Sequence, residues 1–235
     1  MIDRTRTVKR VCWTLAVGFC VALGARATAN EQAFRKPTAA ELDAMVLVPS
    51  GKFVFGKDFK KTEVDLPAFL IDKHEVTNRQ FAKFNLDHKF DPVDADLPAT
   101  MVSQIDARNH CEALDKRLPT EQEWEKAARG TDGRAYPWGN EFDPEAAVTN
   151  ETEFGAHPPH PLIVGSRAKG RSPYGAFDMV CNVWEWTNSN DGRYFVLRGG
   201  SFFEDRSYAT VTSRLLSIPN DSKDYVGFRC AKSAK

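Results

Sequence analysis

The sequence predicts one α+β domain with little regular secondary structure, and three observations support this fold class. Short extended apolar runs occur near residues 45–71 and again near the end of the chain. Three short helices with recognisable N-terminal caps lie between residues 77 and 130. The stretch 131–177 consists mostly of turn sequences, and such a long irregular segment is uncommon in a compact domain. The part after residue 29, about 205 residues, suits one domain with a substantial core.

The first extended run covers residues 45–56, and it contains Pro49, Ser50 and Gly51 near its middle. These three residues favour a turn, so the run predicts a β-hairpin. A further extended run follows at 66–71. The stretch 87–100 is rich in aspartate and proline and predicts a loop.

Two short helices are expected on either side of that loop. Thr77 is a candidate N-cap for a helix that places Phe81 and Phe84 on one face. Ser103 begins the second helix. Its apolar residues at helical spacing are Ile105, Ala107, Cys111 and Leu114.

The clearest helix begins after Thr120. Thr120 and Glu123 have the spacing of a capping box, in which each residue satisfies backbone N–H groups of the other. Gly130 is the expected C-terminal stop. The inner stripe of this helix should consist of Trp124, Ala127 and Ala128.

Two further strands are expected near the C-terminus. The run 194–203 predicts a strand that ends at Gly199 and Gly200, where the backbone needs unusual angles or a close approach. The run 225–231 predicts a single terminal strand.

Residues 1–29 have the pattern of a secretory signal peptide. Basic residues precede an apolar stretch at 11–25, and small residues with the spacing of a cleavage site follow it. The alternative is an uncleaved anchor helix, but the apolar stretch is short for a membrane span. Cleavage would leave residues 30–235 as one domain in the periplasm, and nothing else in the chain approaches a span.

Charge argues against nucleic acid as a partner. The whole chain has 32 basic and 32 acidic residues. Residues 1–29 contain five of the basic residues and one of the acidic residues, so the remainder has a net charge near −4. Nucleic-acid binding proteins present a basic footprint instead.

Three cysteines lie outside the predicted signal peptide, namely Cys111, Cys181 and Cys230. In an oxidising compartment two of them should pair and one should stay free. The residues alone leave all three pairings open.

The most informative run is 178–187, which holds two tryptophans, two carboxylates and an amide within ten residues. Asp178, Asn182 and Glu185 need partners if they lie near buried rings, because an unpaired buried carboxylate is costly. Oxygen ligands around Ca²⁺ would supply this. An ordinary hydrogen-bonded loop is the alternative.

Seven motifs occur in one order along the chain: MVLVPSGKF (45–53), KHEVTNRQF (73–81), KRLPTEQEWEKAARG (116–130), YPWGN (136–140), DMVCNVWEW (178–186), RGGSF (198–202) and VGFR (226–229). Together they resemble the formylglycine-generating enzyme, or sulfatase-modifying factor, family. The resemblance covers residues 45–231. It implies a complex α/β fold with little regular structure that is related to C-type lectin domains.

The resemblance also implies ligands for Ca²⁺. The side chains of Asp178 and Glu185 and the backbone carbonyls of Cys181 and Val183 match a calcium site of the family, although the family has glycine where this chain has Cys181. A second calcium site of the family would start at Asn150 and the backbone carbonyl of Glu151. The later aspartate ligand of that site is missing in this chain.

Two expectations about cysteine chemistry follow from the resemblance. Cys111 and Cys230 match a structural disulfide of the oxygen-dependent members, which would leave Cys181 as the free thiol. The family's enzymes carry two reactive cysteines, which bind copper, between the RGGS and GFR motifs. The segment 202–226 contains no cysteine, so sulfatase activation is not expected.

We therefore expect a non-catalytic regulatory protein that uses the old substrate cleft for protein contacts. A small periplasmic member of this kind resembles the accessory component of the type VI secretion threonine-phosphorylation pathway. The implied partners are the periplasmic region of a membrane Ser/Thr kinase and an outer-membrane lipoprotein.

The alternative is a periplasmic enzyme with altered oxidative chemistry, like the members that mature siderophores. Acidic, basic and tyrosine side chains in and after the RGGS motif could line its pocket: Glu204, Asp205, Arg206, Tyr208 and Arg214. Structural ion pairs of the two arginines are the favoured interpretation. An aromatic patch for partners could include Tyr136, Trp138, Trp184 and Trp186, although core packing is favoured for the last two.

Overall fold

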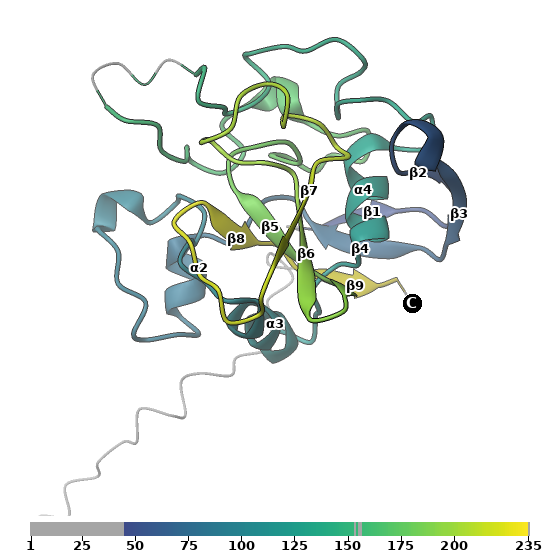
Figure 1. The fold of residues 1–235 in the computed structure, drawn as a ribbon. Coiled ribbons are helices and arrows are strands. Elements are labelled where there is room, and N and C mark those ends of the chain that lie inside the picture. The colour runs from purple at the N-terminus through teal and green to yellow at the C-terminus, as the bar shows by residue number, and fades with distance from the viewer. Residues whose placement is uncertain (1–44, 153, 155–156, 235) are drawn as a thin grey trace, which may run out of the picture. The chain divides into compact units, whose positions relative to one another are not determined.

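The computed structural model describes residues 45–152, 154 and 157–234. The predicted signal peptide and the boundary at residue 30 lie outside these residues and stay predictions. All of these described residues belong to one compact unit. Its described part combines short strands and a few short helices, which confirms the predicted fold class (Figure 1). No helix in the described part is long and apolar enough to cross a membrane.

The N-terminal strands enter two separate sheets. β1 (Met45–Val48) pairs antiparallel with β4 (Phe69–Asp72), and β4 pairs with β9 (Ala231–Ser233). β2 (Gly51–Phe55) pairs with β3 (Thr62–Leu66). The predicted hairpin at 45–56 is therefore wrong.

The physical reason for this error is nonlocal pairing. The chain turns after β1 as expected, but the two flanking strands find their partners in the later run 62–72. Pro67 interrupts that run and has no N–H for a sheet ladder. The interruption separates β3 from β4 and sends them to different sheets.

A four-stranded sheet carries the tryptophan-rich motif. Its order is β7 (Arg214–Ser217), β6 (Tyr194–Arg198), β5 (Trp184–Asp191) and β8 (Val226–Phe228). β5 and β8 are parallel, and the other neighbours are antiparallel. Figure 1 shows this sheet near the centre of the view, with β7 drawn in front of β6.

The predicted terminal strand at 225–231 is broken into β8 and β9. Arg229 and Cys230 lie between them, and both side chains are fully buried. Arg229 pairs with Glu185 and Cys230 forms a disulfide, so the chain leaves one sheet here and joins the other.

The helices begin as predicted. α2 (Asn78–Ala82), α3 (Gln104–Ala113) and α4 (Glu121–Arg129) follow the caps Thr77, Ser103 and Thr120. The capping box of Thr120 with Glu123 is present, and α4 ends at Gly130. Three 3₁₀ turns accompany them: η1 (Asp58–Lys60), η2 (Pro92–Asp94) and η3 (Ala168–Gly170).

The buried face of α3 differs from the prediction. Ala107 and Cys111 are buried as expected, but Ile105 and Leu114 are only half-buried. Gln104 and His110 take their places in the interior. His110 packs among the rings of Phe81, Phe84 and Phe228, at 5.3–5.6 Å between centroids.

The core divides around the four-stranded sheet. Trp124 of α4 packs with β1, β4 and the 176–181 segment. Trp184 and Trp186 of β5 pack with α2, α3 and β8. The described part of 131–177 has the predicted turn character, since η3 is its only named element. Its Val148 bridges to Cys181 and so anchors this stretch to the tryptophan-rich run.

Candidate functional site

The two tryptophans of the central motif belong to the core. Trp184 and Trp186 are each 1% exposed. The indole of Trp186 donates to the carbonyl of Val102 at 2.8 Å, and that of Trp184 donates to Oε1 of Glu204 at 2.8 Å. This confirms core packing for both rings and removes them from any partner-binding patch.

Glu185 lies between these tryptophans and forms a fully buried ion pair with Arg229. Two nitrogens of the guanidinium, Nε and Nη2, donate to the two carboxylate oxygens at 2.7 Å each. The indole of Trp124 adds a third hydrogen bond to Oε2 at 2.8 Å. Both charges are therefore paired where no water reaches them.

The remaining donors of Arg229 join separate segments. Nη1 donates to the carbonyls of Asp72 and Lys73, and Nη2 donates to the carbonyl of Phe177. One side chain thus connects the end of β4, the segment before Asp178 and the start of β5. The ion pair organises the region that holds the predicted calcium ligands.

A second carboxylate, Glu75, is buried beside this pair and was not predicted as a site residue. It is 1% exposed and accepts hydrogen bonds from Nδ2 of Asn182 at 3.1 and 3.2 Å. Burial raises its pKa well above the ordinary value, and the charges of Asp178 and Glu185 raise it further. The only signal in the sequence was its place in the KHEVTNRQF motif.

Asp178 completes this group of carboxylates. It is 7% exposed, and its Oδ2 accepts from the backbone N–H of Gly165 at 2.6 Å. Burial raises its pKa to about 6 against that hydrogen bond and the charge of Arg229. The structure thus brings Asp178 and Glu185 into one polar centre, which also contains Asn182.

This centre fits a hydrogen-bonded core better than a cation at Glu185. Ca²⁺ in proteins takes about six to eight oxygen ligands. Glu185 already accepts three hydrogen bonds, two of them from a guanidinium, so a cation would compete with Arg229. In the described part of the chain, no three His, Cys, Asp or Glu side chains group closely enough to hold a metal. Calcium binding by Asp178, Glu185 and the carbonyls of Cys181 and Val183 stays a prediction.

The backbone of this motif is strained at three residues. Asp178, Cys181 and Asn182 have φ angles of +56°, +62° and +65°, in the left-handed region that favours glycine. Cys181 is fully buried and unpaired. Burial raises the pKa of its thiol well above the ordinary value, and the nearby charges of Glu204 and Asp205 act in the same direction.

The residues of the second predicted calcium site contact the 203–206 loop. The backbone N–H of Asn150 donates to the carbonyl of Glu204, and its Nδ2 donates to the carbonyl of Phe203. The carboxylate of Glu151 pairs with Arg206. These contacts leave calcium binding at Asn150 and Glu151 a prediction.

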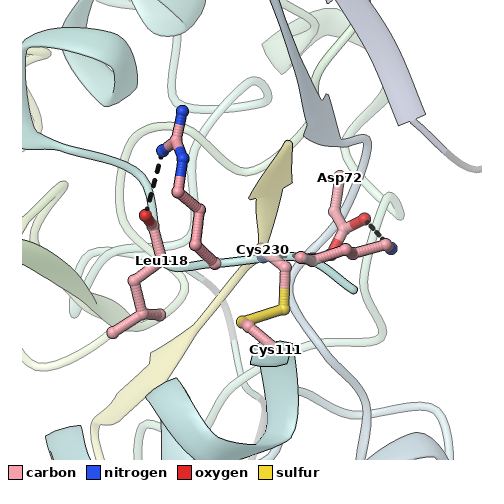
Figure 2. Close-up of a disulfide and its surroundings, with 6 residues drawn as sticks. Asp72, Cys111, Leu118 and Cys230 are labelled. Carbon is pink, nitrogen blue, oxygen red and sulfur yellow. Dashed lines mark hydrogen bonds and ion pairs between the residues drawn. A yellow bond between two sulfur atoms is a disulfide. The ribbon is translucent and has the colours of Figure 1, made fainter. Parts of the chain in front are cut away.

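The disulfide between Cys111 and Cys230 is present, as the resemblance implied (Figure 2). It joins the end of α3 to the segment between β8 and β9 across 119 residues of sequence. Nearby, Lys116 and Asp72 form an ion pair at 2.6 Å. The disulfide fits an oxidising compartment.

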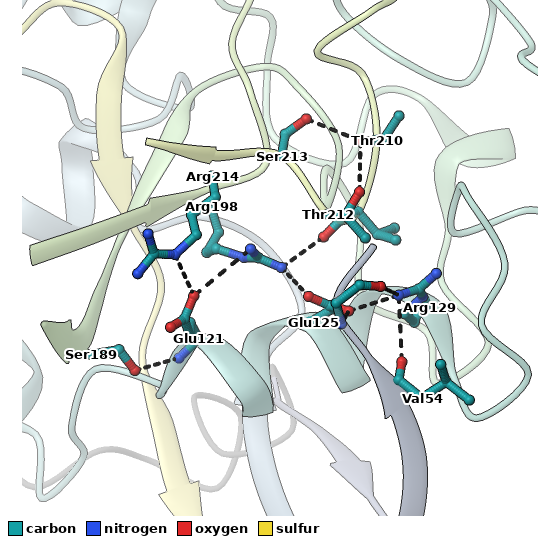
Figure 3. A network of polar contacts seen from close by, with 12 residues as sticks. Val54, Glu121, Glu125, Arg129, Ser189, Arg198, Thr210, Thr212, Ser213 and Arg214 are labelled. Atoms are coloured by element: carbon teal, nitrogen blue, oxygen red, sulfur yellow. Dashed lines mark hydrogen bonds and ion pairs between the residues drawn. The ribbon is translucent and has the colours of Figure 1, made fainter. Parts of the chain in front are cut away.

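A separate network of charges lies between α4 and β6, on the face of the sheet that also carries Glu185 (Figure 3). Glu125 of α4 is fully buried between Arg198 and Arg129, with which it forms two ion pairs. Glu121 pairs with Arg214 at 3.0 Å. Each of these arginines is paired with a glutamate, which indicates a structural role.

This result decides between the two interpretations of the predicted acid–base pocket. Arg214 pairs with Glu121, and Arg206 pairs with Glu151. Glu204 accepts hydrogen bonds from Trp184 and from Ser201. The predicted structural ion pairs of both arginines are confirmed.

The loop that carries Arg206 presents two exposed aromatic side chains and contacts a partly buried aromatic cluster. Phe203 and Tyr208 in this loop are 46% and 51% exposed. The guanidinium of Arg206 lies 5.4 Å from the ring of Phe142. Phe142 contacts Tyr136, and Tyr136 stacks on Trp138 at 5.2 Å. We call these residues the aromatic surface: Tyr136, Trp138, Phe142, Phe203, Arg206 and Tyr208.

Comparison with known families agrees with this architecture. A family model described as "Sulfatase-modifying factor enzyme 1-like domain" matches residues 29–234. The chain belongs to this family. The exposed loop of the aromatic surface lies within the segment between the RGGS and VGFR motifs, before β7.

Several curated members of the family are similar in sequence. "Inactive C-alpha-formylglycine-generating enzyme 2" of Bos taurus is 39% identical over 157 residues, covering 59% of this chain and 51% of the bovine protein. The mouse protein of the same name is 30% identical, covering 81% and 86%. The chain thus spans about half the length of the bovine relative.

Two bacterial relatives have other names. "Hercynine oxygenase" of Mycolicibacterium smegmatis is 29% identical, with 67% of this chain and 54% of that protein covered. "Serine/threonine-protein kinase pkn1" of Chlamydia pneumoniae is 27% identical, with 82% and 38% covered. The family therefore includes proteins named for enzymes as well as proteins named as inactive.

Among solved structures, PvdO from Pseudomonas aeruginosa superposes with a TM-score of 0.67 at 21% identity, covering 81% of this chain and 94% of that one. CarF gives a TM-score of 0.62 at 22% identity, covering 81% and 98%. At these identities the likeness shows the fold alone.

Proposed function

We propose that this chain is a non-catalytic regulator built on the sulfatase-modifying factor fold. One observation carries the proposal: the loop between the RGGS and VGFR motifs has no thiol. The only unpaired cysteine in the described part of the chain is Cys181, which is fully buried. The thiolate is the form that binds copper and attacks substrates, and burial disfavours it here.

The similarity to the two mammalian proteins named as inactive formylglycine-generating enzymes supports this proposal. In such members the fold would persist as a scaffold after the chemistry is lost, because function depends on the site and not on the fold. The polar centre around Arg229 and Glu185 would keep that scaffold rigid.

The proposed partner is the periplasmic region of a membrane Ser/Thr kinase of type VI secretion, with this chain as a positive regulator. An outer-membrane lipoprotein would hold the complex in place. The C. pneumoniae relative supports the link, since a protein named as a Ser/Thr kinase contains a stretch similar to this chain. The Cys111–Cys230 disulfide is compatible with the periplasm.

The aromatic surface is the proposed contact site. Exposed aromatic and arginine side chains are enriched where proteins bind one another. Phe203 and Tyr208 project from a loop whose base is fixed by Ser201, Glu204 and Trp184. A partner could therefore contact a preorganised loop and lose little conformational entropy.

Affinity capture from the native cell envelope tests this function, with three baits compared in parallel. The unaltered chain should recover the kinase and the lipoprotein. Phe203→Ser removes an exposed ring of the aromatic surface and should lose both. Phe59→Ser is the matched control, because Phe59 is 94% exposed on η1 and is not part of that surface.

The competing function is a periplasmic enzyme with altered oxidative chemistry, and the name of the M. smegmatis relative is the observation that favours it. The same preparation distinguishes the two. An unaltered chain that recovers no kinase but carries a small metabolite or a redox metal would replace the regulatory function with the enzymatic one.

A further inference from the structure

β7 forms an unprotected edge of the four-stranded sheet. It pairs with β6 on one side, and no strand in the described part of the chain pairs with its other side. Its outer backbone N–H and C=O groups are therefore available to another strand. The sequence analysis assigned no strand to this segment.

The edge is also apolar. Leu215 and Leu216 are each 38% exposed, and Ile218 directly after the strand is 47% exposed. Met101, whose N–H bonds to the carbonyl of Lys223 in the neighbouring turn, is 60% exposed. Proteins usually protect an edge with lysine, proline or an inward-pointing charge. Here Arg214 is the only charged residue of β7, and it is engaged by Glu121.

We propose that β7 pairs antiparallel with β7 of a second copy of this chain, so that two four-stranded sheets become one. A two-fold axis perpendicular to the sheet relates such copies. Directly opposed residues then lie on the same face of the combined sheet. Because side chains alternate between faces along a strand, the numbers of two opposed residues must differ by an even number. This condition requires a register that is centred on a residue.

Leu216 is the residue at that centre. It opposes Val196 within its own sheet. Its side chain lies on the same face of the sheet as that of Arg214, which opposes Arg198. Centring the register there places Leu216 against Leu216 of the second copy and Leu215 against Ser217 of the second copy. Arg214 then lies opposite Ile218 of the second copy, and no like charges meet across the strands.

The register centred on Leu216 is complementary to itself, which favours a second copy as the occupant. Arg214 begins β7, whereas Asp221 lies in the turn after it, where its N–H bonds to the carbonyl of Ile218. Both groups are paired within their own chain, Arg214 with Glu121 and Asp221 with Lys223, so neither end of the strand presents an unpaired charge to the second copy. Residues 30–235 have a formal net charge near −4, which is small for a chain of this length, so two copies repel only weakly.

Sedimentation over a concentration series tests the pairing on the secreted protein with its disulfide intact. The unaltered chain should sediment as a dimer at high concentration. Leu216→Arg should weaken dimerisation by roughly tenfold or more, because it places like charges face to face at the centre. Phe59→Arg, at a 94% exposed position on η1, should leave dimerisation unchanged.

Cross-linking tests the register. Leu216→Cys should give a disulfide-linked dimer on mild oxidation, because opposed Cα atoms in an antiparallel pair lie at about 4.5–5.5 Å, within reach of such a bond. Phe59→Cys should not. A monomer at every concentration, a dimer that Leu216→Arg leaves unaffected, or a dimer that Leu216→Cys fails to cross-link would each overturn the proposal. These outcomes are independent of kinase binding, which uses the aromatic surface.

Discussion

Arg229 and Glu185 form a bidentate ion pair in which both side chains are completely shielded from solvent. The pair connects the last segment of the chain to the tryptophan-rich motif, and the other donors of Arg229 fix the carbonyls of Asp72, Lys73 and Phe177. The folded state of the polar centre depends on both partners being present.

Removing one partner of this pair should be strongly destabilising. Arg229→Met leaves the Glu185 carboxylate buried with only the Trp124 indole as a donor, which should lower the free energy of unfolding by about 3–5 kcal/mol. Adding Glu185→Gln to Arg229→Met should recover part of this loss, because the stranded charge is gone. Urea denaturation of the unaltered chain, the two single variants and the double variant measures both effects, and an additive double variant would contradict the coupling.

Glycine should be better than alanine at position 181. Both substitutions remove the buried thiol of Cys181, but only glycine also relieves the left-handed backbone at φ +62°. We expect Cys181→Gly to exceed Cys181→Ala in unfolding free energy by about 1 kcal/mol, the reverse of the usual order for these residues. Thermal or urea unfolding of the pair is the measurement, and equal stabilities would show that the backbone is not strained there.

His110 should make the protein sensitive to acid. Burial among aromatic rings lowers its pKa from 6.5 to about 4, and the charge of Lys116 adds to the effect. The unfolded chain takes up a proton below its ordinary pKa while the folded chain does not. The stability from the neutral imidazole is therefore present above pH 6.5 and is lost as the pH falls toward 4.

Between neutral pH and about pH 5 this group should cost roughly 2 kcal/mol of stability. His110→Leu should remove that share of the pH dependence. Comparing each protein with itself at the two pH values cancels any packing cost of the substitution. An unchanged pH dependence in the leucine variant would show that His110 is not the sensitive group.

Calcium binding at the tryptophan-rich motif predicts a ligand effect on stability. If Asp178, Glu185 and the two carbonyls bind Ca²⁺, calcium at about 100 times its Kd should stabilise chelator-treated protein by about 2.7 kcal/mol. Asp178→Asn should lose most of this gain, and the exposed control Asp205→Asn should keep it. Identical unfolding in calcium and in chelator would contradict calcium binding at this motif, and the ion pair with Arg229 would then be the role of Glu185.

Local signals in the sequence predicted the parts of the fold that depend on neighbouring residues. Thr77 and Thr120 cap their helices because the partner of each cap is three residues away. Gly130 ends α4 because its φ of +74° lies in the region that favours glycine, which is also a local property. The seven ordered motifs predicted the fold class and the Cys111–Cys230 bond by resemblance, and the structure confirms both.

The features that failed or were missed depend on distant residues. β1 turns at Pro49 as its sequence indicates, yet it pairs with β4 and not with β2. Glu75 is part of the polar centre because Asn182, 107 residues later, reaches it. The buried place of His110 depends on rings from α2 and β8. No local pattern contains these partners.

The central claim is that the chain regulates by binding and does not catalyse. The most direct measurement is equilibrium binding of the purified chain to the periplasmic region of the kinase, with Phe203→Ser and Phe59→Ser measured alongside. We predict saturable binding that Phe203→Ser weakens by roughly tenfold or more and that Phe59→Ser leaves unchanged. Absence of binding, or equal binding by all three proteins, would contradict the claim.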